Sequence, residues 1–178
     1  MSRAAMFLLV ATVCKAGSMC QNPPSRHELR KYLTPEGRLQ ARLVLRDGQQ
    51  GFAGVSGEIW TIEPEGHLSI ARFLNDKTDP PYRERTLAPA ELKELGKVLA
   101  KEHFVDLPNS FGRDVKVDAH VLTLGFGTKQ STLVLQGGET VSDETTPPAD
   151  DPQTSAWCNF IAIVKALQKL TRDQKRAE

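Results

Sequence analysis

The residues whose types and spacing best suit chemistry are two aspartates and a histidine that precede a strand-like segment. Asp114, Asp118 and His120 are separated by four and two residues. In an extended segment, side chains at even spacing point to the same side, and carboxylates with an imidazole can bind a divalent metal ion. These three residues are therefore the candidate metal site of a small metal-dependent hydrolase. The alternative is a set of ordinary charged loop residues, because no zinc-type spacing accompanies them.

Other catalytic signatures are absent from the sequence. The four histidines, His27, His67, His103 and His120, form no His-Glu-x-x-His motif. We expect His67 and His120, at the starts of strands, to lie on the surface. The stretch 54–57 (GVSG) departs from the Gly-x-Ser-x-Gly elbow of hydrolases, so its serine is expected to serve a turn. The sequence thus assigns no catalytic residue and implies no cofactor.

The N-terminus has the layout of a secretory signal. A positive residue, Arg3, precedes the apolar run 4–13, and small residues follow at 16–18. The run is too short for a membrane anchor, so we expect cleavage after Ser18 and export to the periplasm, the cell envelope or the medium. The alternative is a buried N-terminal helix of a cytosolic protein.

The cysteines bear on the same question. Removal of residues 1–18 would take away Cys14 and leave Cys20 and Cys158, which could form a disulfide in an oxidising compartment. The alternative is that Cys158 is an ordinary buried apolar residue and Cys20 lies in a free tail. Neither Cys14 nor Cys20 follows the small residue that a lipobox requires, so lipidation is the less favoured reading.

The charge balance excludes a general attraction to polyanions. The chain has 178 residues, 23 of them basic and 22 acidic, and the expected signal carries two of the basic ones. The mature chain would then have 21 basic and 22 acidic side chains, a net charge of −1. We therefore expect no nucleic-acid partner. No mature segment approaches the roughly 20 apolar residues of a membrane span.

The chain divides into four parts. We expect a signal peptide at 1–18, a linker with a short helix at 19–37, one domain at 38–172 and a charged tail at 173–178. The length fits a single domain. Within that domain, alternation and helical periodicity predict an ordered set of elements: a strand near 39–45, a glycine-rich loop or bulged strand at 48–57, a hairpin of 58–63 and 67–74, a helix from 89 to about 103, a hairpin of 120–126 and 130–136, an acidic loop at 137–151, and a long helix from 152.

This order predicts an α+β fold in which an antiparallel sheet, built from two β-hairpins, carries helices on one face in the order ββα-ββα. Trp60 and Trp157 fall on apolar faces and are expected in the core.

Several short motifs resemble a family of uncharacterised exported bacterial domains. They are the stretch 51–54 (GFAG), the strand 60–62 (WTI) with the turn at 65–66, and the segment 87–92 (LAPAEL) followed by Phe104 and Leu107-Pro108. The similarity covers roughly residues 43–135. The family often has cysteines near the first glycines, and this chain has none there. The resemblance implies an antiparallel α+β fold and a cell-envelope setting, and it carries over no activity.

Together, these observations predict a non-enzymatic envelope or secreted module that binds a partner, expected to be a protein, through a sheet face or a loop. The glycine-rich and acidic loops are the expected contact surfaces, because contacts tend to lie on loops.

Overall fold

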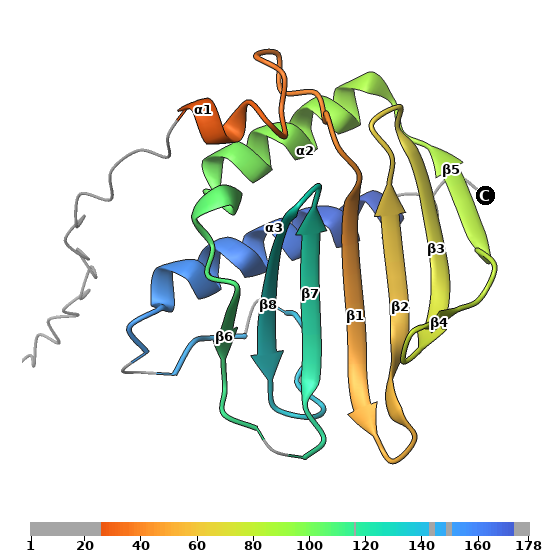
Figure 1. Ribbon diagram of the computed structural model, residues 1–178, viewed down its shortest axis with the longest axis vertical. Helices are drawn as coiled ribbons and strands as arrows, with labels where there is room; N and C mark the ends of the chain where they lie inside the picture. The colour runs from red at the N-terminus through yellow and green to blue at the C-terminus, as the bar shows by residue number, and fades with distance from the viewer. Residues whose placement is uncertain (1–25, 116, 143–144, 149–150, 173–178) are drawn as a thin grey trace, which may run out of the picture.

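The computed structural model describes residues 26–115, 117–142, 145–148 and 151–172. These residues form a mixed α+β fold with one large, mostly antiparallel sheet, which confirms the predicted class (Figure 1). In chain order the elements are α1 (Arg26–Leu29), β1 (Leu43–Gly51), β2 (Gly54–Ile62), β3 (His67–Leu74), β4 (Lys77–Thr78), β5 (Arg83–Thr86), α2 (Pro89–Lys101), the 3-10 turn η1 (Phe104–Asp106), β6 (Ser110–Gly112), β7 (His120–Phe126), β8 (Lys129–Leu135) and α3 (Thr154–Arg172).

The sheet has eight strands in the order β4-β3-β2-β1-β7-β8-β6, with β5 also paired to β3. The two predicted hairpins are present as β2–β3 and β7–β8. The simple order of two hairpins, each followed by a helix, is not what the structure shows. Strand β1 joins the two hairpins at the centre of the sheet, β4 and β5 lie along β3, and β6 pairs with β8 in parallel.

The glycine-rich run was expected to be a loop or a bulged strand, and the structure shows that it is mostly strand. Strand β1 continues to Gly51, and β2 begins again at Gly54. Gly48 and Gly57 face each other in register, and Phe73 of β3 is the next residue across from Gly57. The Phe73 ring covers this glycine pair, and the Arg46 guanidinium lies 4.3 Å from the centre of that ring. An aromatic side chain on a neighbouring strand can thus compensate for glycines within a sheet.

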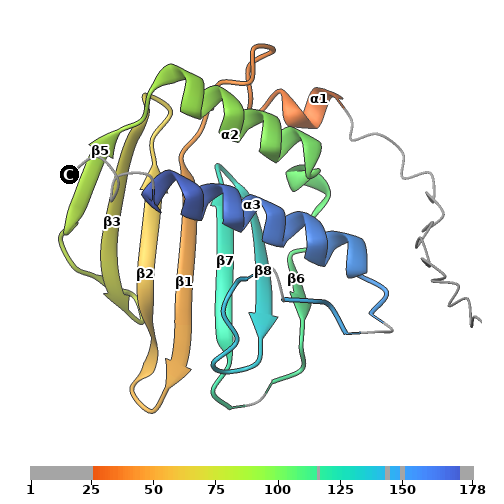
Figure 2. The same cartoon turned by 180° about the vertical axis from the view of Figure 1, so that it is seen from behind.

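Helices α2 and α3 both cross the same face of the sheet (Figure 2). Along β1, Leu43 and Leu45 are buried beneath them, whereas Val44 and Arg46 are only half-buried on the other face. This is the alternation expected of a sheet covered on one side. The predicted apolar stripe of the C-terminal helix is confirmed, with Trp157, Phe160, Ile161, Val164 and Leu167 all buried, and Trp60 is buried as well.

The segment before β1 also contributes to the core. Tyr32 and Leu33 are buried, although they lie in the part expected to be a linker and a short helix. The Tyr32 ring lies 5.3 Å from that of Phe126 and 6.4 Å from that of Phe104, between centroids. The packed body therefore begins before residue 38.

Arg85 connects three elements at the β5 edge of the sheet. Its guanidinium donates two hydrogen bonds to the carboxylate of Glu91 in the first turn of α2, at 3.1 and 2.8 Å. It donates a third, at 2.6 Å, to the carbonyl of Leu170 near the end of α3. The Glu91 carboxylate also accepts from the backbone N–H of Ala88, which completes the start of α2. One side chain thus fixes both long helices to an outer strand.

Several predictions fall outside the described residues. These are the signal peptide at 1–18, Cys20 and therefore its disulfide with Cys158, and the charged tail at 173–178. Within the described part of the chain, no helix is both long and apolar enough to cross a membrane.

Candidate functional site

A polar cleft of about 590 Å³ opens on the helix-covered side of the sheet. Its walls come from β1, β2, the start of β7, the loop after β8 and one residue of α3. The described lining residues are Asp47, Gln49, Ser56, Gly57, Glu58, His120, Gly138, Glu139, Thr140, Val141, Ser142 and Gln168. The glycine-rich run and the acidic loop, which we expected as separate contact surfaces, thus meet in a single cleft.

Strand alternation brings the carboxylates into this cleft. Asp47 follows Leu43 and Leu45 at the same spacing, so it lies on the helix-covered face in the middle of β1. It pairs in register with Glu58 of β2, which in turn pairs with Arg72 of β3. Two like charges directly opposite each other destabilise a sheet. The pair therefore needs compensating donors nearby, and both acids have them.

The Asp47 carboxylate is compensated by His120. The imidazole Nε2 lies 2.6 Å from Oδ1 of Asp47. The other ring nitrogen, Nδ1, is hydrogen-bonded to the backbone carbonyl of Glu139. A carboxylate and a carbonyl can only accept hydrogen bonds, so both ring nitrogens must carry a proton. The geometry therefore selects the imidazolium form.

The electrostatics of the site favour the same form. Burial of the ring alone would lower the pKa of His120, because it penalises the charged state. The hydrogen bonds to Asp47 and to the Glu139 carbonyl outweigh burial, and the net effect raises the pKa of His120 above its usual value.

Glu139 anchors the acidic loop to the core. Its carboxylate accepts two hydrogen bonds from the Arg113 guanidinium, at 2.9 and 2.7 Å, and one of 2.8 Å from the backbone N–H of Gln136. The hydrogen bonds from Arg113 are the main reason why the pKa of Glu139 is lowered. The same guanidinium lies 5.6 Å from the centre of a Trp157 ring. This wall of the cleft is therefore held in place by charged and aromatic contacts.

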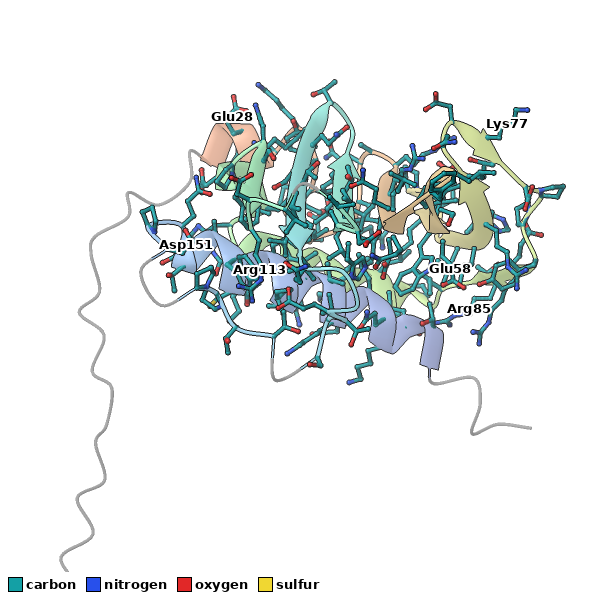
Figure 3. All side chains as sticks on the ribbon, turned by 90° about the horizontal axis from the view of Figure 1, so that it is seen from below. Glu28, Glu58, Lys77, Arg85, Arg113 and Asp151 are labelled. Carbon is teal, nitrogen blue, oxygen red and sulfur yellow. The ribbon has the colours of Figure 1, made fainter. Side chains whose placement is uncertain are left out.

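Glu58 is held on the opposite wall. Its carboxylate accepts a hydrogen bond of 2.5 Å from the Tyr82 hydroxyl and one of 3.3 Å from Nε1 of Trp60. Burial of the phenol, followed by its hydrogen bond to Glu58, raises the pKa of Tyr82 to about 12. Figure 3 places Glu58 and Arg113 on the side of the sheet that carries α3.

The predicted metal site does not assemble as expected. The residues between Arg113 and Ala119 that the structure describes are not a strand, and the backbone of Asp118 is left-handed, with φ 56°. Asp114 and Asp118 are exposed, whereas His120 is buried on the covered face, so the expectation that His120 is a surface residue is wrong. Asp118 contacts the site through its backbone carbonyl, which accepts a hydrogen bond of 2.9 Å from the Gln49 side chain. No group of three metal-ligating side chains occurs among the residues described.

Two further predictions can be compared with the structure. His67 is exposed, as expected, at the start of β3. Cys158 is exposed on α3, so the alternative that it is a buried apolar residue is wrong.

The strand order also separates Ser56, one of the two serines that line the cleft, from the His120 imidazole. Gln49 of β1 pairs with Ser56 on one side and with His120 on the other. Ser56 and His120 are thus two strand spacings apart, roughly 10 Å. A serine nucleophile needs its base within hydrogen-bonding reach, so these two residues do not form a catalytic pair.

Sequence reasoning identified His120 but missed the three acids around it, Asp47, Glu58 and Glu139. A signal for Asp47 was available, since it continues the alternation of Leu43 and Leu45. Comparison with known proteins adds no further residue: no protein-family model matches the chain, and no curated protein matches it significantly. The resemblance to exported bacterial domains stays a prediction.

Proposed function

We propose that this protein is an exported binding module that engages a protein partner through the polar cleft and performs no chemistry there. The observation that carries the proposal is the state of His120, whose two ring nitrogens are both committed to acceptors. An imidazole in this state has no free lone pair with which to accept a proton or bind a metal ion. Both of its N–H groups are directed at acceptors of the protein itself and not into the cleft as proton donors to a ligand.

The charges around the cleft support a binding role. The carboxylates of Asp47 and Glu139 form ion pairs with the His120 imidazolium and with Arg113, and Glu58 accepts a hydrogen bond from Tyr82. A cleft in which two of three carboxylates are neutralised has little net attraction for a metal ion. Its remaining side chains are mostly amides and hydroxyls, which suit the hydrogen-bonding rim of a protein interface.

A second observation supports the proposal: hydrogen bonds hold the walls of the cleft in place. Hydrogen bonds hold the acidic loop to Arg113 and His120, and both sides of the cleft are therefore organised before a partner arrives. A surface that is ordered in advance loses less entropy on binding.

A matched pair of serine substitutions tests the proposal. Ser56→Arg places a long cation in the cleft, whereas Ser110→Arg places the same side chain on exposed β6, at the far edge of the sheet. Each variant and the wild type is immobilised and incubated with an envelope extract of the producing cells, and the retained proteins are identified by mass spectrometry.

We expect wild type and Ser110→Arg to retain the same partner, and Ser56→Arg to lose it. Retention of that partner by Ser56→Arg, or failure of the wild type to retain any protein above a blank matrix, would contradict the proposal.

Export is the part of the proposal that rests on the sequence alone, through residues 1–18. It predicts that protein recovered from its native cells has the intact mass of a chain beginning at or near Met19. A cytoplasmic protein with the full mass would refute it.

A further inference from the structure

The turn between β1 and β2 holds a phenylalanine entirely in solvent. Phe52 is more exposed than any other large apolar side chain of the described residues, at 112% of the reference value. It lies between Gly51 and Gly54, outside the apolar core. A buried phenylalanine would stabilise the fold, and Phe52 makes no such contribution. Folding therefore does not account for a phenylalanine at this position.

The turn that carries Phe52 is fixed by Asn75 of the neighbouring β3–β4 turn. The Asn75 amide donates to the carbonyl of Ala53 at 3.1 Å and accepts from the backbone N–H of Val55 at 3.0 Å. The backbone N–H of Asn75 donates to the carbonyl of Val55 at 2.7 Å. The carbonyl of Asn75 accepts from Arg46 at 2.6 Å. These bonds lock the exposed turn to the body of the sheet.

Gly54 shows that the fit is specific. Its backbone is left-handed, with φ 110°, and an added Cβ would lie 2.0 Å from the side-chain oxygen of Asn75. Only glycine allows this approach. The sequence thus provides both a glycine and an asparagine to present a side chain that the fold does not use.

Two other exposed apolar residues lie at the same end of the sheet. Val117 is 70% exposed and Leu74 is 46% exposed. Val117 precedes β7, which pairs with β1 next to the turn, and Leu74 pairs with Ser56 of β2. Figure 1 shows the β1–β2, β3–β4 and β6–β7 connections together at this end. Phe52 is therefore the most exposed of three apolar side chains at this end of the sheet.

The charges beside these side chains favour a protein over a lipid bilayer. The described residues of 74–77 and 114–118 contain three aspartates and one lysine. An anionic bilayer attracts loops with an excess of basic residues, and there is none here. Aromatic side chains seated in a pocket of the partner are typical anchors of protein interfaces.

We propose that Phe52 is the anchor of the protein interface and inserts into an apolar pocket of the partner, with Asn75 as the positioning residue that holds its turn. The inference rests on the proposed function, because Gln49 and Ser56 of the cleft lie on the two strands that this turn joins. The partner would contact the polar cleft and the apolar turn at once.

Site-specific photocrosslinking separates the two claims. The photoreactive residue p-benzoylphenylalanine replaces Phe52 in one sample, Gln49 at the cleft in a second, and Lys101, an exposed residue of α2, in a control. Each purified protein is mixed with an extract of the producing cells, either alone or together with unlabelled wild type, Phe52→Ser or Asn75→Ala as competitor. The mixture is then irradiated.

Both claims predict one adduct of the same mass from positions 52 and 49 and none from position 101. An adduct from 49 alone would overturn the anchor and leave the cleft proposal intact. An adduct from 52 alone would support the anchor and contradict the cleft. Adducts from neither position, or equally from all three, would contradict both. Adducts only with lipid would overturn the protein partner.

The competitors test the role of each residue. Phe52→Ser should need roughly 30-fold more protein than wild type to suppress the adduct, the effect of removing a strong anchor. Asn75→Ala, which keeps Phe52 but frees its turn, should also compete less well. Phe52→Ser should unfold at the same temperature as wild type. Equal competition by Phe52→Ser and wild type would overturn the anchor.

Discussion

At the scale of single residues, the state of His120 determines what the cleft can do. The ring is buried, lies between two acceptors, and is held in the charged form that a free imidazole largely loses near neutral pH. Its pKa is raised, so its contribution to stability is complete below its ordinary pKa of about 6.5. That contribution is lost as the pH rises through the higher pKa of the folded state.

Asp47→Asn tests this linkage. At pH 5.5 the substitution should lower the free energy of unfolding by about 1.5–3 kcal/mol, because it removes a hydrogen bond between charged groups. At pH 9 the loss should be smaller, since neutral His120 no longer depends on the carboxylate. Urea denaturation at both pH values measures the difference.

The matched control is Asp118→Asn, an exposed aspartate in a left-handed backbone conformation that asparagine also adopts. It should change the free energy of unfolding by less than about 0.5 kcal/mol at either pH. Losses of equal size for Asp47→Asn at both pH values would show that the pair is not linked to the protonation of His120.

At the scale of elements, the β1–β2 hairpin depends on the absence of side chains where its strands approach most closely. A Cβ added to Gly57 would lie 1.9 Å from the backbone carbonyl oxygen of Asp47. Backbone cannot move aside as a flexible side chain can. The packing of Phe73 over Gly48 further restricts any shift of the strands.

Gly57→Ala should therefore lower the free energy of unfolding by about 1–3 kcal/mol, the usual cost of overpacking. Gly51→Ala is the control in the same hairpin, because an added Cβ there would lie 3.9 Å from its nearest neighbour. The control should stay within about 0.5 kcal/mol of wild type. Urea denaturation measures the free energy of unfolding of both variants. Equal values would contradict the close approach of Gly57 to the Asp47 backbone.

The same elements show what can be predicted from sequence. Periodicity within a segment was sufficient for the β2–β3 and β7–β8 hairpins and for the apolar stripe of α3, since each pattern is local. For the glycine run, a loop and a bulged strand both stayed open, because its strand character depends on Phe73 from a third strand. Likewise, His120 was a candidate, but its partner Asp47 lies 73 residues away in the sequence. No local pattern could bring these two residues together.

At the scale of the whole molecule, the outer strand β5 and the two long helices are joined through Arg85. Its side chain is only 17% exposed, and its planar guanidinium reaches the carboxylate of Glu91 and the carbonyl of Leu170 together. Lysine has one ammonium group and cannot reproduce this fork.

Arg85→Lys should lower the free energy of unfolding by about 1.5–3 kcal/mol, because hydrogen bonds of a charged group in a half-buried site are lost. Arg42→Lys is the matched control. Arg42 pairs with Glu63 at 2.7 Å, but its side chain is 63% exposed, and pairs of this kind contribute little. If urea denaturation showed the same loss of stability for both substitutions, the hydrogen bonds of Arg85 to α2 and α3 would not contribute to the stability of the fold.

The described part of the molecule thus presents a sheet with helices on one face, and both proposed contact features, the polar cleft and the Phe52 turn, include residues of the strand pair β1–β2. The described edges of the sheet are less suited to adding a strand. Residues Pro80 and Pro81 separate β4 from β5, and β6 has three residues. Proline and short strands are common means of protecting a sheet edge. Recognition through the cleft and the turn is therefore favoured over recognition by strand addition.

The most direct test of the central claim is nitrogen NMR of the His120 side chain in the isotope-labelled protein, titrated from pH 5 to pH 9. We predict that both ring nitrogens are protonated at neutral pH, and that His120→Gln removes the assigned signals. A neutral ring with one unprotonated nitrogen at neutral pH would leave a base available in the cleft. That result would contradict the assignment of this site to binding alone.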